Sequence, residues 1–372
     1  MSTEKKGRLI ALDGLKGLLS ITIILIHYTS NAMNKFGATT DQLPFYKIMR
    51  TFYDQGYVFI FPFFWISGFL IAMKYKESLK HMGLGTFLKR RMRKLYPMVF
   101  ASITIGVIMS ILDKYLTGSA STTPFDFWLL IKDYSLTYSG WAEPVEKIGY
   151  VGGVEWFICV MLLCYIYYYL IVHKVSRENY LIAISVAFFA GWAVYAWPLG
   201  PMPFFGGKGG YCAFFGGTLL YEFIYGDLKC VFKSTLNDKT KTVLSAVAVM
   251  AIALLGITGH LSMMSVLVFV CPLMIVFSLE IGWIKSILEF KPFQVLGMLS
   301  MSIYLSHSLT LRAAVMIIKC LGLNCTFRDI PVFFTVITGC FVFAVIYYFL
   351  IEKKFVPFFN NRIGKIFPYF AE

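Results

Sequence analysis

The chain has 372 residues, of which 58% are hydrophobic and only 15% are charged. Soluble domains contain about 25% charged residues, so this composition excludes an ordinary soluble domain, which could not cover its surface with polar groups. The formal net charge is +14. Basic loops beside a membrane and attraction to anionic lipid headgroups account for such an excess. We therefore expect the lipid bilayer, and no nucleic acid, as a partner.

The first apolar segment runs from Leu9 to about Ala32. It is longer than the core of a secretory signal peptide, which has about 7–15 residues, and no small-residue cleavage site follows a short core. We expect it to be a retained first membrane span. Since a spanning helix needs about 20 mostly apolar residues, the sequence predicts an all-α polytopic membrane protein, a bundle of about ten transmembrane helices near residues 9–31, 57–73, 95–112, 155–172, 180–198, 210–226, 242–259, 262–280, 294–318 and 331–351.

The predicted span 210–226 is the least regular of the ten, because Gly209, Gly210, Gly216 and Gly217 lie in or beside it. It is either a continuous helix or a broken or re-entrant one. No internal repeat and no soluble appendage is visible, so residues 1–372 are expected to form a single transmembrane domain.

Lys and Arg are concentrated on one side of the predicted bundle. With ten spans, about 23 of the 34 Lys and Arg residues fall on the side of the N-terminus, against about 9 on the other side. Cytoplasmic loops carry such an excess. The pattern predicts that the N-terminus, the C-terminus and the loop around Lys80 face the cytoplasm.

The first span contains charged residues, although a charge at the bilayer centre costs about 2.5–3.5 kcal/mol. Asp13 and Lys16 lie three residues apart, and His27 follows eleven residues after Lys16. At about 100° per residue, Lys16 and His27 share one helix face, about 16 Å apart along the axis. Gly14 and Gly17 would let a neighbouring helix approach closely. The sequence predicts a polar seam that points into the bundle.

Two interpretations of this seam remain open. Asp13 and Lys16 can form a structural ion pair near the inner interface, or they can belong to a reaction site. The imidazole of His27 on the same face favours a site, because His acts as a general base near neutral pH, and acyl transfer to a hydroxyl needs such a base. His27, Asp13 and Lys16 are therefore the candidate catalytic residues.

Further motifs match one known family. DGLKGL from Asp13, followed by His27, resembles a first-span motif of a basic residue, ten others and His. FFWISGF from Phe63 resembles a second-span signature, and the following RRMRKLYP supplies an arginine pair and a proline. EWFICVMLLCY from Glu155 resembles a Trp-containing fourth span, and LGMLSMSIYLSHS from Leu296 resembles a Ser/Tyr/His penultimate helix. In this combination the chain resembles the acyltransferase 3 family, the membrane-bound O-acyltransferases that modify bacterial surface glycans.

The resemblance departs from the family pattern at two places. Lys16 stands where many members have Arg, which keeps the charge but loses bidentate hydrogen bonding. Glu352 ends the last span as the family's glutamate does, but Lys353 and Lys354 follow where a proline is common. The family's optional C-terminal esterase-like domain is expected to be absent.

The resemblance implies a transmembrane acyltransferase domain in a bacterial cytoplasmic membrane. Acetyl-CoA or another acyl-CoA would donate an acetyl or other short acyl group to a hydroxyl of a cell-surface glycan. Arg90, Arg93 and Lys94 fall on one side of a helix and are the candidate ligands of the coenzyme A phosphates, because guanidinium groups suit phosphate. Arg91 is expected to point elsewhere, towards lipid headgroups. The cluster is equally expected of a basic cytoplasmic loop, so ligand binding and membrane topology both explain it.

Four residues in the outer half of the bundle are candidates for substrate binding: Glu155, Trp156, Tyr304 and His307. The aromatic belt at the membrane interface also explains Trp156, and a buried interhelical hydrogen bond also explains Tyr304 and His307. The loop from about Lys114 to Val154 contains Trp128, Tyr134, Tyr138 and Trp141. It is a candidate for stacking on an acceptor sugar or for anchoring at the interface.

Other residues carry less functional information. Ser67 and Gly68 are expected to serve close helix packing, and Arg312 within the ninth span needs a partner or solvent. Cys320 and Cys325 could form a disulfide. No CxxC pair or His/Cys spacing of a metal site occurs, so no metal is expected.

The alternative function is a transporter or flippase that exports a polysaccharide or a lipid-linked sugar. Ten spans, charges inside the membrane and a glycine-rich sixth span fit that class as well. The absence of an inverted repeat, and the position of the cation cluster at one edge, favour the acyltransferase. The sequence does not indicate an oligomeric state.

Overall fold

The computed structural model describes residues 9–118, 127–137, 141, 154–196, 209–229 and 237–366, and every regular element within them is a helix. The predicted all-α fold is confirmed. In chain order the elements are α1 (Ile10–Phe36), η1 (Thr40–Gln42), α2 (Tyr46–Gln55), η2 (Gly56–Ile60), α3 (Phe61–Leu79), α4 (Leu84–Thr117), α5 (Phe127–Ser135), α6 (Trp156–Lys174), α7 (Arg177–Ala196), α8 (Gly210–Ile224), α9 (Asp238–Ile257), α10 (Met263–Ser265), η4 (Val266–Val270), α11 (Cys271–Glu280), α12 (Gly282–Leu288), α13 (Lys291–Cys320), α14 (Ile330–Tyr347), η5 (Tyr348–Phe355) and α15 (Val356–Ile366).

Seven helices in the described part of the chain are long and apolar enough to cross a membrane. The number rises to eight if Val266–Glu280 and Gly282–Leu288, which meet at an angle of 91°, form one span. The protein is therefore built as a multi-pass membrane protein, and the count of about ten stays a prediction. The glycine-rich segment explains part of the difference, because α8 is a continuous helix of 15 residues. That length spans about 22 Å, short of the roughly 30 Å hydrocarbon core.

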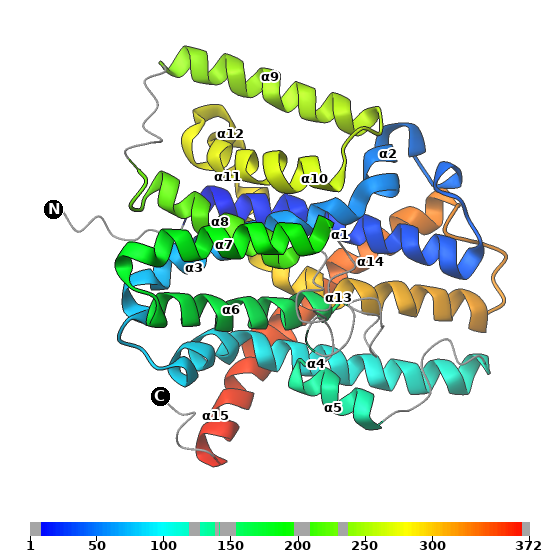
Figure 1. The fold of residues 1–372 in the computed structure, drawn as a ribbon. Helices are drawn as coiled ribbons and strands as arrows, with labels where there is room; N and C mark the ends of the chain where they lie inside the picture. The colour runs from blue at the N-terminus through cyan, green and yellow to red at the C-terminus, as the bar shows by residue number, and fades with distance from the viewer. Residues whose placement is uncertain are drawn as a thin grey trace.

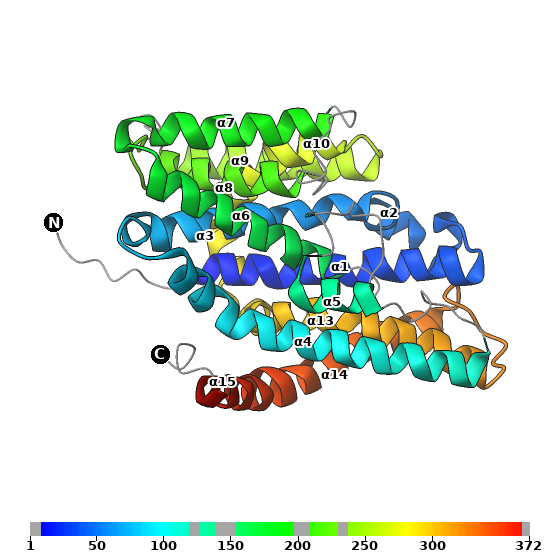
Figure 2. The same cartoon turned by 60° about the horizontal axis from the view of Figure 1, so that its bottom comes forward.

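Helix α1 packs closely along α13, and glycines on both helices make this possible. A Cβ atom on Gly17 would lie 2.6 Å from the backbone nitrogen of Gly297, and a Cβ atom on Gly297 would overlap the carbonyl oxygen of Asp13. The close approach expected from Gly17 is confirmed. Figure 1 shows α1 and α13 as neighbours, and Figure 2 shows α1 between a group with α7, α8 and α9 and a group with α4, α13 and α14.

Helices α3 and α8 form a second close pair. A Cβ atom on Gly68 would overlap the backbone of Phe214, and one on Gly217 would overlap the backbone of Trp65. The packing role expected of Gly68 is confirmed. Most residues of α8 are buried, so it forms part of the core on which α3 and α7 pack.

The first turns of α1, the start of α4 and the end of α14 lie at one end of the bundle. Lys94 of α4 forms an ion pair with Glu352 of η5, and both line a cavity with Asp13 of α1. The N-terminal end of α1, the first helix, and the C-terminal end of α15, the last helix, both lie towards this end (Figure 1). We call it the inner end of the bundle. The distribution of Lys and Arg predicts that this end faces the cytoplasm.

Candidate active site

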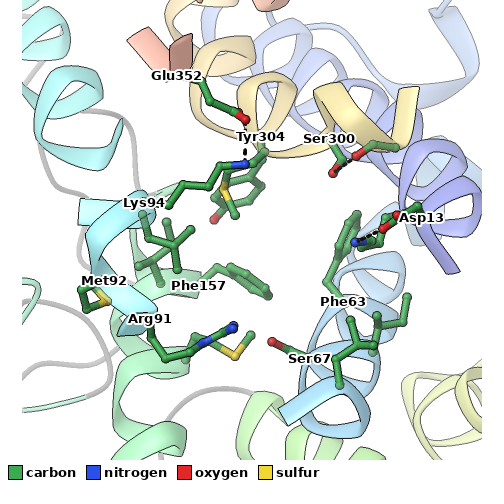
Figure 3. Close-up of a pocket in the computed structure, with 18 of the residues that line it drawn as sticks. Asp13, Phe63, Ser67, Arg91, Met92, Lys94, Phe157, Ser300, Tyr304 and Glu352 are labelled. Atoms are coloured by element: carbon green, nitrogen blue, oxygen red, sulfur yellow. Dashed lines mark hydrogen bonds and ion pairs between the residues drawn. The ribbon is translucent and has the colours of Figure 1, made fainter. Parts of the chain in front are cut away.

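A cavity of about 750 Å³ lies between α1, α3, α4, α6, α13 and η5. Its size falls within the roughly 300–1,000 Å³ of small-molecule and cofactor sites. Figure 3 shows Arg91 and Lys94 on one wall, with Asp13, Phe63 and Ser67 facing them. The cavity combines a charged inner part with an apolar part lined by side chains such as Ile23, Phe63 and Phe157.

Asp13 and Lys16 form the predicted ion pair on the wall of this cavity, with 2.6 Å between Oδ1 of Asp13 and Nζ of Lys16. Their positions follow from the packing of α1 on α13, because Gly297 touches the backbone of Asp13 and also lines the cavity. Both side chains keep some exposure, 14% for Asp13 and 26% for Lys16. The pair is therefore accessible to a molecule in the cavity.

The basic residues of α4 divide differently from the sequence prediction. Arg90 and Lys94 line the cavity, and Lys94 Nζ lies 2.6 Å from Glu352 Oε1. Arg93 is exposed and does not line the cavity; its carbonyl oxygen accepts a hydrogen bond from Asn360. The structure therefore brings two of the three predicted phosphate ligands to the cavity and leaves the third outside it.

Arg91 lies inside the cavity, so the expectation that it meets lipid headgroups was wrong. Its Nη2 donates a 2.8 Å hydrogen bond to the hydroxyl of Tyr165. The centre of its guanidinium group lies 4.9 Å from the ring centroid of Tyr165 and 5.9 Å from that of Tyr75. The physical reason is the orientation of α4: Phe87, one turn earlier on the same face, is fully buried against Tyr75, Tyr165 and Tyr169.

Ser67 continues this polar chain across the cavity. Its hydroxyl lies 3.3 Å from that of Tyr165. Because the oxygen of Tyr165 accepts from Arg91, its hydroxyl proton is free to be donated to Ser67. Ser67 also lines the cavity, so its hydroxyl adds a polar group to the cavity wall beside the packing role expected of it.

His27 and His307 meet just beyond the apolar end of the cavity. Their ring centroids are 4.7 Å apart, with the ring planes tilted by 53°. Each follows a cavity-lining residue by about one turn, Ile23 on α1 and Tyr304 on α13. His27 is partly buried and His307 fully buried. The imidazole of His27 is thus aligned with the Lys16 side of α1, as the seam predicts, but does not itself line the cavity.

The outer candidates lie at the start of α6 and on α13, where Tyr304 lies beside His307. Tyr304 lines the cavity, its hydroxyl donates to the carbonyl oxygen of Val154, and its ring centroid is 6.1 Å from that of His307. Glu155 is 1% exposed and immediately precedes α6. Trp156 packs on Phe64, with ring centroids 6.0 Å apart.

Arg312 has the partners that a charge within a span needs. Its Nη1 donates to the carbonyl oxygen of Gly106 and to the hydroxyl of Ser110, both on α4. The charge of Glu155 acts on it as well. It therefore ties α13 to α4 near the outer candidates.

The aromatic residues proposed for acceptor stacking are in different surroundings. Trp128 is exposed, whereas Tyr134 lies 2.9 Å from the hydroxyl of Thr104 and Trp141 donates to the carbonyl oxygen of Cys159. Tyr138 lies outside the described residues. Cys320 and Cys325 are both free thiols, so the disulfide considered for them is absent.

Sequence reasoning did not identify several cavity residues, among them Tyr75, Arg91, Tyr165, Tyr348 and Lys353. One signal was present for Arg91. Phe87 lies four residues before it, so the two share a helix face, and an aromatic residue in a basic segment indicates the face that turns inward. No comparable pattern marks the tyrosines of α6, because α6 is apolar on all sides.

The family of the protein follows from a family model described as an acyltransferase domain, which matches residues 9–370. No curated protein and no solved structure matches the chain. The family match covers nearly the whole sequence, including every candidate residue above, and supports acyl transfer at a membrane. The chain belongs to the acyltransferase 3 family and is a multi-pass membrane acyltransferase.

Proposed function

We propose that the protein transfers an acetyl or other short acyl group from acyl-CoA to a hydroxyl of a cell-surface or exported glycan in a bacterial cytoplasmic membrane. One observation carries the proposal. A single cavity reaches from the cations Arg90, Arg91 and Lys94 to a point one helical turn short of His27 and His307. Such a cavity suits a donor with anionic phosphates at one end and a reactive thioester at the other.

The phosphates of coenzyme A would bind at the inner end. Arg91 is the strongest candidate there, because Tyr75 and Tyr165 hold its guanidinium in place before a ligand arrives. A pre-organised donor loses less side-chain entropy on binding. Arg90 and Lys94 add charge nearby, and a phosphate can replace Glu352 as the partner of Lys94. Arg93, outside the cavity, would contribute only long-range attraction.

The pantetheine arm would run along α1 past Lys16. This path would bring the thioester towards His27. His27 would take the proton of an acceptor hydroxyl while the oxygen attacks the thioester carbonyl carbon. The carbon–sulfur bond then breaks, and the departing thiolate takes the proton from the imidazolium. Lys16, held by Asp13, would position the donor or stabilise the negative charge that develops.

The acceptor sugar would approach from the opposite end, where Tyr304 lies beside His307 and where Glu155 and Trp156 begin α6. A covalent acyl group on His27 is the alternative route between the same two substrates. Labelled acyl-CoA without acceptor distinguishes the two, since only the covalent route leaves label on the wild-type protein and none on His27→Ala.

The proposal is tested with purified protein in lipid nanodiscs, given acetyl-CoA labelled in the acetyl group and a glycan acceptor. We expect label on the glycan, one free thiol for each acetyl group transferred, and neither product with coenzyme A in place of acetyl-CoA. A transporter or flippase would instead move a labelled glycan across vesicles without consuming acyl-CoA. Glycan movement without thiol release would overturn the proposal.

A further inference from the structure

His307 has a buried polar atom that its surroundings do not satisfy. Its side chain is fully buried, and its Nδ1 lies 3.0 Å from the carbonyl oxygen of Ile303. Within the described residues, its Nε2 has no hydrogen-bond partner. A carbonyl oxygen can only accept, so Nδ1 carries the proton and Nε2 presents a lone pair. Leaving such an atom buried costs free energy, and so the arrangement calls for an explanation.

The imidazole ring of His27 packs against that of His307. With centroids 4.7 Å apart, the two rings are close enough for one nitrogen of each to reach hydrogen-bonding distance when His27 rotates about its χ2 bond. The separation is fixed by the backbone, because Gly17 and Gly297 bring α1 and α13 into contact. The carbonyl bond holds the tautomer of His307, and the buried ring cannot turn towards water.

We propose that His307 is a positioning residue for His27. This inference rests on the proposed function, in which His27 is the base. When the acceptor is bound, one imidazole N–H of His27 donates to Nε2 of His307. The other nitrogen of His27 then presents its lone pair to the acceptor hydroxyl. As that proton arrives, the N–H to His307 becomes a charge-assisted hydrogen bond that stabilises the imidazolium.

A second imidazole suits this position better than the carboxylate that orients histidine in serine hydrolases. A carboxylate inside a membrane is a charge with an insertion cost, whereas a neutral imidazole offers one acceptor without a charge. The pair is therefore uncharged until the proton moves. It is also expected to stabilise the transition state more than the resting state.

The other ionisable side chains on the surrounding helices must stay unchanged for the effect of the pair to be isolated. Tyr304 on α13 and Cys340 on α14 contact His307. Farther from the pair are Asp13 and Lys16 on α1, Tyr53 on α2, Asp113 on α4, Glu155 before α6 and Arg312 on α13. All remain in each variant below.

The test compares His307→Gln with His307→Asn. The amide of Gln reaches the position of Nε2 and keeps an acceptor there, whereas the shorter Asn places its amide near Nδ1. Both are neutral amides in the same helix, and His307→Phe adds a ring without an acceptor. We expect kcat of His307→Asn and His307→Phe to fall about 10- to 100-fold, as for loss of one hydrogen bond to a charged group. His307→Gln should recover most of kcat, and KM for acyl-CoA should stay within about twofold in all three.

The pH profile of kcat provides a readout that a packing defect does not move. The imidazolium of His27 is less stable without the acceptor, so the acid limb should shift to lower pH in His307→Asn and His307→Phe. It should stay near the wild-type position in His307→Gln. Equal losses in all three variants with an unshifted acid limb would show that His307 only packs, and would overturn the inference.

His27→Ala, measured in parallel, separates this inference from the proposed function. If His27→Ala is inactive while His307→Phe has wild-type kcat and an unshifted acid limb, His27 works alone and only the pairing is wrong. If His27→Ala retains wild-type kcat, the proposed base is wrong and the pairing falls with it. Thermal unfolding of each purified variant identifies any loss that is due to misfolding.

Discussion

Arg91 differs from Arg90 and Arg93 in what surrounds its guanidinium group. Two tyrosine rings and a 2.8 Å hydrogen bond from its Nη2 to Tyr165 hold it in the cavity, whereas Arg93 is exposed beside it. Arg90, Arg91 and Arg93 are close together in the sequence, but Arg90 and Arg91 line the cavity and Arg93 does not.

The difference gives a prediction for donor binding. Arg91→Gln should raise the Kd for coenzyme A about 10- to 100-fold, because a charge-assisted hydrogen bond contributes about 1.5–3 kcal/mol. Arg93→Gln removes the same charge from the same helix outside the cavity and should change Kd less than threefold. Titration calorimetry at one ionic strength measures both. Equal losses in the two variants would mean that the cluster acts only through its overall charge.

Asp13 and Lys16 can be tested as a unit. If Asp13 keeps Lys16 charged and in place, Lys16→Met and Asp13→Asn should both lower kcat, since a lone charge in a low-dielectric wall is destabilised. Lys16→Arg keeps the charge and should retain activity. An inactive Lys16→Met beside a fully active Asp13→Asn would show that the pair is not a functional unit.

The relative positions of two side chains follow from the sequence when both lie on one helix. Asp13, Lys16 and Gly17 were correctly related because α-helix geometry alone fixes their mutual positions. Arg91 was misplaced because the rotation of α4 about its axis is set by Phe87 packing on α3 and α6. Helical periodicity gives the angle between two side chains about the helix axis. It does not show which side of the helix faces the interior of the protein.

Among the elements, the contact between α3 and α8 contains a buried ionic cluster outside the cavity. Nζ of Lys76 lies 2.8 Å from Oε2 of Glu222 and 2.9 Å from Oδ2 of Asp227. Glu222 is fully buried, so it depends on Lys76 to offset its charge. The hydrogen bond from Lys76 also lowers the pKa of Asp227 below its usual range.

We predict that this cluster is a major stabilising contact of the inner end. Lys76→Met should destabilise the protein by about 3–5 kcal/mol, because it leaves Glu222 buried without a counter-charge. Lys80→Met removes a matched lysine from an exposed pair with Glu77 and should cost at most about 1 kcal/mol. Unfolding in detergent, followed by circular dichroism, compares them. A similar cost for both variants would contradict the role of burial.

The pH dependence of that stability has a definite sign. Because the pKa of Asp227 is lowered in the folded state, its contribution is present above its usual unfolded value, about 3.9, and is lost as pH falls through the folded value. Wild-type protein should therefore lose more stability in acid than Asp227→Asn does. The same unfolding measurement, repeated between neutral and acidic pH, checks this.

For the molecule as a whole, the hydropathy of the sequence predicted where helices form better than it predicted which of them span the membrane. A helix lies at each predicted segment, yet in the described part of the chain seven or eight helices are long and apolar enough to cross a membrane. Helix α8 is apolar because it is buried in protein, and the 20-residue α9 is apolar and mostly exposed. Sequence hydropathy does not distinguish protein from lipid as the surroundings. The cavity could not be derived either, since it forms where six elements distant in sequence meet.

We propose that acyl-CoA enters this cavity and reacts beside His27. This is tested by measuring kcat for glycan acylation and Kd for acyl-CoA together, in wild type and in folded His27→Ala. A general base contributes about 10²–10⁴-fold and acts mainly in the transition state, so we expect kcat to fall by this factor while Kd stays the same. A His27→Ala variant that acylates the glycan at a near-normal rate would contradict it.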